Sequence, residues 1–211
     1  MEMSQEKKLV SMTADSSMSL REDFNLHQKS RWVVRLVVFF FSLAGFSATA
    51  SPVDGQGIDR EYKLKAAFLY KFATYFQWPD SAFETAESPF VIGILGSSPV
   101  ETGLRKIAAV KKVGNRKIVV QKYQSPDDVD ACHILFMSRA VNNENQKSVI
   151  KRLARGNILF VGETLDFLKL GGVIDLVVQE NHIRIYLSKS AYEREGLKTN
   201  AQFLRVATIV K

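Results

Sequence analysis

Phe90-Val-Ile-Gly-Ile-Leu-Gly96 is a short, continuous apolar run that ends in glycine, and it indicates the class of fold. A strand buried on both faces of a sheet has this composition, because none of its positions needs to meet water. Two later runs share the pattern, at 132–138 (Cys-His-Ile-Leu-Phe-Met-Ser) and 157–162 (Asn-Ile-Leu-Phe-Val-Gly). Such strands are typical of parallel sheets covered by helices, so the sequence predicts an α/β protein.

Helical patterns alternate with these runs. Apolar residues recur three and four positions apart in the first helical segment, as expected for one face of a helix. The segment stops before Trp78-Pro79, because proline disfavours helical geometry in the residue before it. We predict helices at 61–76, 99–110 and 142–154, the last closed by Gly156 as a C-cap, and a further strand at 117–123.

The pattern changes after residue 171. Two segments, 172–179 and 182–188, flank Glu180-Asn181, and apolar residues alternate with polar ones in the second. This alternation predicts an antiparallel hairpin. Two capping boxes follow, Ser190-x-x-Glu193 and Thr199-x-x-Gln202, and predict a short helical turn before Gly196 and a terminal helix at 200–210. The predicted architecture is a partly parallel central sheet flanked by helices, with an antiparallel hairpin near the C-terminus.

The N-terminal part of the chain has the pattern of a secretory signal. The apolar run 36–46 follows Lys29, Arg31 and Arg35, and Ala48-Thr-Ala50 comes after it. A run of this length suits a signal peptide better than a membrane span, although an uncleaved anchor over 33–50 is the alternative. We therefore expect an exported, periplasmic protein with the following organisation: signal peptide 1–50 cleaved near Ala50, flexible leader 51–59, and a single α/β domain at 60–211.

Charge and cysteine content narrow the function classes further. The formal net charge is +7, but the positive residues are spread along the chain and do not form a nucleic-acid-binding stripe. We therefore expect no nucleic-acid partner. Cys132 is the single cysteine, so it cannot form an intramolecular disulfide. Its apolar neighbours favour burial, and pairing between two chains is the alternative.

No motif in the sequence predicts catalysis, a metal or a cofactor. His133 and His182 lack a second ligand at metal spacing, so structural roles are favoured for both. The turn Gly96-Ser97-Ser98 could hold an anion, but it lacks the spacing of a nucleotide-binding loop, and an ordinary strand-to-helix turn is favoured. We expect the acidic group Asp127-Asp128-x-Asp130 to be a solvated loop. The chain is thus not expected to be an enzyme, although a hydrolase site assembled from scattered residues stays open.

Aromatic residues are concentrated on and just after the first helix. One interpretation is that this helix is buried between the sheet and another element; the other is that it forms a surface for a partner or for self-association. Phe167 and Arg184 are weaker candidates for an exposed recognition patch. The candidate partner-binding or dimerisation residues are Phe68, Phe72, Tyr75, Phe76, Trp78, Phe167 and Arg184.

Residues 65–79, Lys-Ala-Ala-Phe-Leu-Tyr-Lys-Phe-Ala-Thr-Tyr-Phe-Gln-Trp-Pro, resemble the opening helix of the YfiR family of exported bacterial proteins. Further matches follow in the family's order over about residues 60–210, among them 90–96, Gly114-Asn-Arg-Lys117, 132–136, 158–162, Gly171-Gly172, Arg184, Gly196-Leu-Lys198 and Phe203-Leu204.

The resemblance implies a periplasmic regulator, dimeric, that binds the periplasmic domain of an inner-membrane diguanylate cyclase. It would hold that enzyme inactive, and so lower cyclic diguanylate and biofilm formation. The single Cys132 departs from the disulfides of the best-known member and puts thiol-based control in doubt. The alternative function is a small-ligand-binding sensor for another envelope signalling protein.

Overall fold

The computed structural model describes residues 55–164 and 166–210. The expected signal peptide at 1–50 and the first four residues of the expected leader lie outside these ranges. Within the described ranges, no helix combines the length and apolar character needed to cross a membrane.

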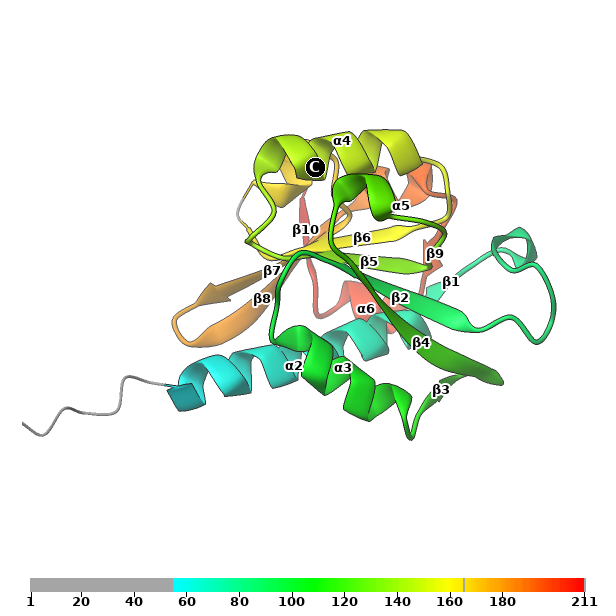
Figure 1. Ribbon diagram of the computed structural model, residues 1–211. Helices are drawn as coiled ribbons and strands as arrows, with labels where there is room; N and C mark the ends of the chain where they lie inside the picture. Colours follow the sequence, from blue (N-terminus) through cyan, green and yellow to red (C-terminus); the bar gives the residue numbers. More distant parts are fainter. Residues whose placement is uncertain (1–54, 165, 211) are drawn as a thin grey trace, which may run out of the picture. The chain divides into compact units, whose positions relative to one another are not determined.

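The described chain contains helices on both faces of a mixed sheet (Figure 1). The strands of this sheet are β2 (Phe90–Leu95), β3 (Lys112–Val113), β4 (Arg116–Tyr123), β5 (Ile134–Met137), β6 (Leu159–Gly162), β7 (Ile174–Gln179), β8 (His182–Ser188) and β10 (Thr208–Val210). The α-helices are α2 (Gly55–Tyr75), α3 (Val100–Ala108), α4 (Asn143–Leu153), α5 (Lys189–Arg194) and α6 (Ala201–Leu204). The 3-10 helices are η1 (Asp80–Ala82), η2 (Pro126–Asp128) and η3 (Phe167–Leu170).

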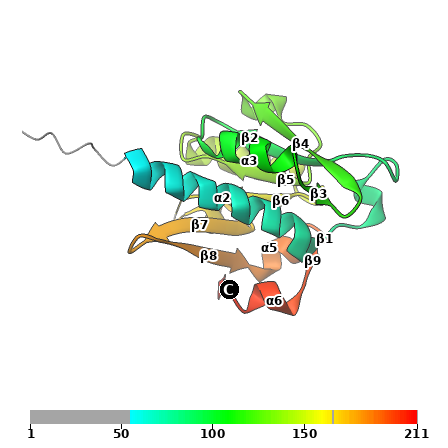
Figure 2. The same ribbon diagram turned by 90° about the horizontal axis from the view of Figure 1, so that it is seen from below.

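The sheet has the strand order β10-β8-β7-β6-β5-β2-β4-β3. Its centre, from β4 to β7, is parallel, whereas β7 and β8 form an antiparallel hairpin. The five central strands follow the order 2-1-3-4-5 of doubly wound sheets. Helices α2 and α3 lie together on one face and α4 lies on the other (Figures 1 and 2). The predicted α/β class, the parallel sheet and the C-terminal hairpin are confirmed.

Burial explains the composition of the central strands. Ile92 and Ile94 of β2 are fully buried, as are the apolar residues of β5 and β6. Gly93 is required between Ile92 and Ile94, because a Cβ atom at this position would lie 2.7 Å from the ring of Tyr123 on β4. The continuous apolar runs in the sequence therefore correspond to strands with a helix over each face.

The first helix begins earlier than the sequence predicted. Helix α2 starts at Gly55, so residues 55–59 of the expected flexible leader are helical. Several charged residues follow Gly55 and Gly57 in the helix, and Lys63 forms an ion pair with Asp59 one turn before it, which stabilises this first part of α2. At its other end α2 gives way to β1 (Phe76–Gln77), which pairs with β9 (Lys198–Thr199).

The predicted terminal helix at 200–210 is wrong beyond its first turn. Helix α6 ends at Leu204, and β10 then pairs in parallel with β8. The β-branched residues of this segment, Thr208, Ile209 and Val210, favour a strand once β8 offers a free edge.

Three predicted helix caps are also wrong. The Ser188 side chain accepts the Ala191 N–H and caps α5, and Asn200 accepts the Phe203 N–H and caps α6. These residues displace Ser190 and Thr199 as caps. At the end of α4, Arg155 adopts the left-handed conformation instead of Gly156, and its N–H donates to the Glu195 carboxylate at 2.7 Å. The position of each helix end is thus set by the residue that can form a capping hydrogen bond in the folded chain.

Candidate functional site

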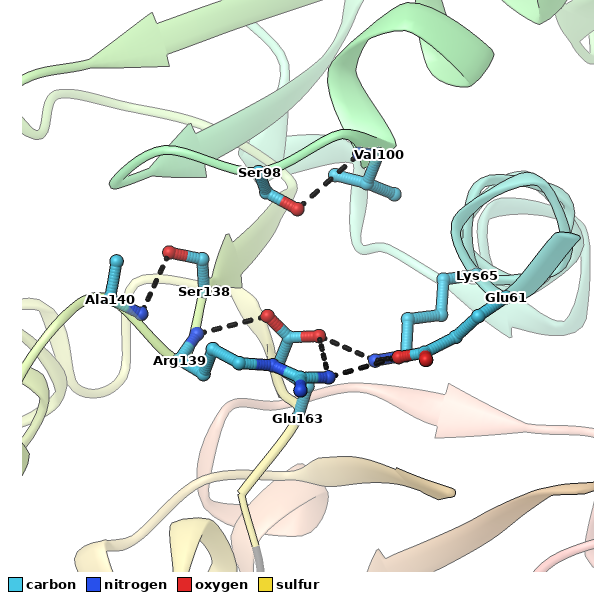
Figure 3. Close-up of polar contacts among 8 residues, drawn as sticks. All are labelled: Glu61, Lys65, Ser98, Val100, Ser138, Arg139, Ala140 and Glu163. Atoms are coloured by element: carbon cyan, nitrogen blue, oxygen red, sulfur yellow. Dashed lines mark hydrogen bonds and ion pairs between the residues drawn. The ribbon is translucent and has the colours of Figure 1, made fainter. Parts of the chain in front are cut away.

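Loops at the carboxyl ends of the parallel strands meet where the sheet reverses its winding. The chain leaves β2 through α3 toward β4, while β5 lies on the other side of β2. In open α/β sheets such a switch point is where functional residues and ligands are usually found. Three segments arrive here: 96–98 after β2, 138–140 after β5, and Glu163 after β6 (Figure 3).

A buried carboxylate, that of Glu163, is the centre of this region. Lys65 of α2 donates from Nζ to Glu163, and both side chains are fully buried. The backbone N–H of Arg139 donates to Glu163 Oε1 at 2.9 Å, and the Arg139 guanidinium lies 3.4 Å from Oε2. Charges are tolerated inside a protein only when they are paired and hydrogen-bonded in this way.

Glu61 extends the network to the surface. It lies one turn before Lys65 on α2 and accepts a hydrogen bond from Lys65 Nζ at 2.6 Å and one from the Arg139 guanidinium at 2.9 Å. The Arg139 side chain is 56% exposed. The four groups therefore form a chain of ion pairs that joins α2 to the ends of β5 and β6; we call it the Glu163 network (Figure 3).

Asp175 adds a second buried carboxyl group beside the Glu163 network. It lies on β7 opposite Gly162, is only 2% exposed, and its Oδ1 has no hydrogen-bond partner among the described residues. Burial raises the pKa of Asp175 to about 7, and although the backbone of Thr164 and the charge of Lys65 oppose the rise, Glu163 adds to it. Asp175 therefore gains and loses a proton near neutral pH.

This titration predicts a pH-dependent stability. The folded protein keeps the Asp175 proton up to pH about 7, whereas an unfolded aspartate releases it near 3.8. The stabilisation by Asp175 is thus complete below pH 3.8 and is lost as the pH rises through 7. We expect the free energy of unfolding of Asp175→Asn, relative to that of the wild type, to rise by about 2–4 kcal/mol between pH 4 and pH 8. Urea unfolding at a series of pH values measures this difference.

The exposed Asp80 supplies the matched control. Asp80→Asn makes the same substitution at an exposed site, where surface changes usually alter the free energy of unfolding by less than about 0.5 kcal/mol. Parallel pH profiles for wild type and Asp175→Asn would show that Asp175 does not titrate in this range.

The hydroxyl groups at the switch point close their own turns. Ser98 Oγ accepts the Val100 N–H and Ser138 Oγ accepts the Ala140 N–H, each at 3.3 Å (Figure 3). Gly96 has φ +84°, and a Cβ atom there would lie 2.7 Å from Ser138 Oγ, so the two loops pack directly. Chemically, this region can therefore bind a proton at Asp175, beside the Glu163 network that holds α2 against the sheet.

A family model described as YfiR/HmsC-like matches residues 62–208, which is nearly the whole described domain. The chain belongs to the YfiR/HmsC-like family. Members of this family are, in general terms, periplasmic regulators of diguanylate cyclase signalling. No curated protein matches the chain.

Two solved structures are similar to part of this chain. An ABC domain in complex with L-Trp from Streptococcus pneumonia is 9% identical, with a TM-score of 0.43 over 57% of this chain. A conserved domain protein from Vibrio cholerae O1 biovar eltor is 15% identical, with a TM-score of 0.42 over 58% of this chain. The YfiR/HmsC-like chain spans 55% of the length of each.

The candidate aromatic residues of this YfiR/HmsC-like chain are divided between the core and its margin. Phe72 and Phe76 are buried, and both rings make edge contacts with Phe203 of α6, with centroids 5.5 and 5.1 Å away. Phe68, Tyr75 and Trp78 are half-buried. The C-terminal segment therefore covers Phe72 and Phe76, which favours the core interpretation for these two residues.

The structure separates the two weaker candidates. Phe167 is fully buried, with its ring against Gly162 and Gly172, so its assignment to an exposed patch is wrong. The reason is that these glycines leave space for the ring: a Cβ atom on either would lie 2.2 Å from it. Arg184 is exposed on β8, as a recognition residue requires, and borders an open hollow of about 590 Å³.

Cys132 and His133 have structural environments. Cys132 is buried, and burial raises the pKa of its thiol to about 12, so the thiol stays protonated. His133 Nδ1 accepts the Val91 N–H at 3.0 Å, and Nε2 lies 3.1 Å from the Ala82 carbonyl oxygen. Burial also lowers the pKa of His133. The neutral ring therefore links β2 to η1.

Sequence reasoning missed every member of the Glu163 network, although signals were present. Arg139 and Glu163 directly follow apolar strands, where polar residues of a parallel sheet gather at one edge. Asp175 is a lone charge inside an apolar run. Lys65 lies three residues after the buried Tyr62 and four before the buried Leu69, so it occupies the inner face of α2.

Proposed function

We propose that this protein is a periplasmic negative regulator that binds the periplasmic domain of an inner-membrane diguanylate cyclase and holds the cyclase inactive. It would thereby lower cyclic diguanylate and biofilm formation. The observation that carries the proposal is the YfiR/HmsC-like match over residues 62–208, which runs from within α2 to the first residue of β10. A domain matched over this length supports the family's regulatory role better than it supports catalysis.

The proposed mechanism is a shift in a conformational equilibrium. A binding protein can hold an enzyme inactive only if it binds the inactive conformation more tightly than the active one. To move such an equilibrium from 1:99 to 99:1, the preference must be about 10⁴-fold. Because export after cleavage near Ala50 would separate this protein from cytoplasmic nucleotides, its effect has to pass through a membrane-spanning partner.

We also propose that the protein acts as a homodimer.

Deletion of the gene tests the regulatory function. We expect the deletion strain to contain more cyclic diguanylate and to attach better to surfaces, because the cyclase loses its inhibitor. Cyclic diguanylate in cell extracts and crystal-violet staining of attached cells are the measurements. The full-length gene supplied in trans should reverse both changes.

An unchanged level of cyclic diguanylate in a strain that carries a cyclase with a periplasmic domain would contradict the proposal. A metabolite that raises the melting temperature of the purified protein would then favour the alternative, a small-ligand sensor. Buried polar atoms without partners, Thr164 Oγ1 and Asp175 Oδ1, lie among the described residues near the switch point and are consistent with that alternative.

A further inference from the structure

The two edges of the sheet differ in the way they are protected. Lys111 and Lys112 are exposed at the β3 edge, and lysines at an edge discourage the addition of another strand. At the other edge, Thr208–Val210 of β10 are all exposed and carry no charge, with Ile209 48% exposed. No strand of the described chain pairs with the outer side of β10. An uncharged, apolar edge of this kind is a template for a further strand.

A polar hollow lies beside this edge. It is the open hollow of about 590 Å³, and it is lined by Gln179, Glu180, Arg184, Tyr186 and Thr208. The Tyr186 hydroxyl donates to Gln179 Oε1 at 3.1 Å, which holds two of the lining side chains in place. Arg184 forms no ion pair with any described residue. The hollow thus presents the cation Arg184 next to an unpaired strand, with Glu180 as the other charged residue of its lining.

Strand geometry places this cation within reach of an added strand. Thr208 of β10 lies opposite Tyr186 of β8, two residues from Arg184, so the three side chains share one face of the sheet. Neighbouring strands are about 4.8 Å apart, so a strand added outside β10 would lie about 10 Å from β8. A glutamate or aspartate on that face and the long Arg184 side chain can together span this distance.

We propose that β10 is a docking edge for an extended segment of a partner protein, and that an acidic side chain of this segment enters the hollow and pairs with Arg184. Backbone hydrogen bonds along β10 supply affinity, and the Arg184 pair supplies specificity. The inference rests on the proposed function for the identity of the partner, the periplasmic domain of the cyclase.

Charge favours such a partner over a second copy of this chain. A second copy would bring another Arg184 to the same edge, and the chain has a formal net charge of +7. An acidic segment would instead neutralise Arg184.

The test uses a short strand peptide as the probe. Acetyl-Thr-Val-Glu-Val-Thr-amide is added to the purified protein, and protection of the amides at 208–210 from hydrogen exchange is followed as the peptide is titrated. We expect protection that saturates with peptide, and about tenfold weaker binding by Arg184→Glu, because a charge-assisted pair is lost. Arg184→Glu should prefer the matching peptide with lysine in place of glutamate. Ile209→Lys, which copies the lysine protection of the β3 edge, should bind neither.

Lys117→Glu is the matched control for charge, because Lys117 is an exposed strand residue at the far side of the sheet. It should bind the acidic peptide as the wild type does. Absence of protection at 208–210 at millimolar peptide, or equal binding by wild type, Arg184→Glu and Ile209→Lys, would overturn the proposal. A dimer in sedimentation that is lost in Ile209→Lys would show that a second copy occupies the edge, and would overturn the choice of partner.

Complementation of the deletion strain separates the inference from the proposed function. If deletion raises cyclic diguanylate and the folded Arg184→Glu and Ile209→Lys proteins both restore the low level, the docking edge is wrong while the regulatory function stands. If deletion has no effect, the regulatory function fails, and the peptide titration still decides whether β10 accepts an acidic strand.

Discussion

Replacing Lys65 with methionine will destabilise the domain by about 3–5 kcal/mol, because the substitution leaves the Glu163 carboxylate buried without its ammonium partner. Methionine has nearly the volume of lysine, so the loss reports the charge more than the packing. The free energy of unfolding is measured by urea denaturation at pH 7. Arg139 still donates to Glu163 from its backbone, which keeps the expected loss toward the lower end of the range.

The neighbouring Lys63 is the control for this variant. Lys63 is exposed and pairs with Asp59 at the surface, so Lys63→Met should cost less than about 1 kcal/mol. The double variant Lys65→Met with Glu163→Gln should lose less than the sum of the two single variants, because the second change removes the unpaired charge. Additive losses would mean that the two groups do not interact.

Phe203→Ala should cost about 3–5 kcal/mol, because it removes a fully buried ring that holds the C-terminal segment to α2. The ring makes edge contacts with Phe72 and Phe76 and lies stacked 5.9 Å from Tyr75. Phe72→Ala should cost a similar amount, and the double variant should lose less than the sum, since the two rings share a contact. Thermal and urea unfolding measure these losses.

Val206→Ala provides the comparison, because Val206 is exposed two residues after α6 and should contribute less than about 0.5 kcal/mol. Sedimentation at several concentrations separates the two interpretations of the first helix. If Phe72→Ala keeps its stability and instead weakens self-association, the core interpretation is wrong.

Much of the fold could be predicted because the deciding residues are close in sequence. The apolar runs at 90–95 and 134–137 indicated buried strands without reference to the rest of the chain, and the alternation at 182–188 indicated a hairpin. The burial of Cys132 was predicted from its apolar neighbours in the same way. The local sequence pattern was sufficient to predict an element wherever burial alternates or persists among neighbouring residues of that element.

The candidate site could not be predicted in this way, because its parts come from separate elements. Glu61 and Lys65 lie about 100 residues before Glu163 in the sequence, and only the packing of α2 over the carboxyl ends of β5 and β6 brings them together. The residues that cap the helices could not be predicted for the same reason. Asn200 and not Thr199 caps α6, because Thr199 Oγ1 instead donates to the Tyr75 carbonyl at 3.3 Å.

By itself, the sequence determined the α/β class, the order of most helices and strands, and the resemblance to the YfiR family, all of which depend on residues near one another in the chain. Only the tertiary structure decided that Phe72 and Phe167 are core residues, that residues 208–210 form an edge strand, and that Lys65 pairs with Glu163. The physical reason is that burial, pairing and the pKa of a group depend on the atoms around it, and most of those atoms belong to residues far away in the sequence.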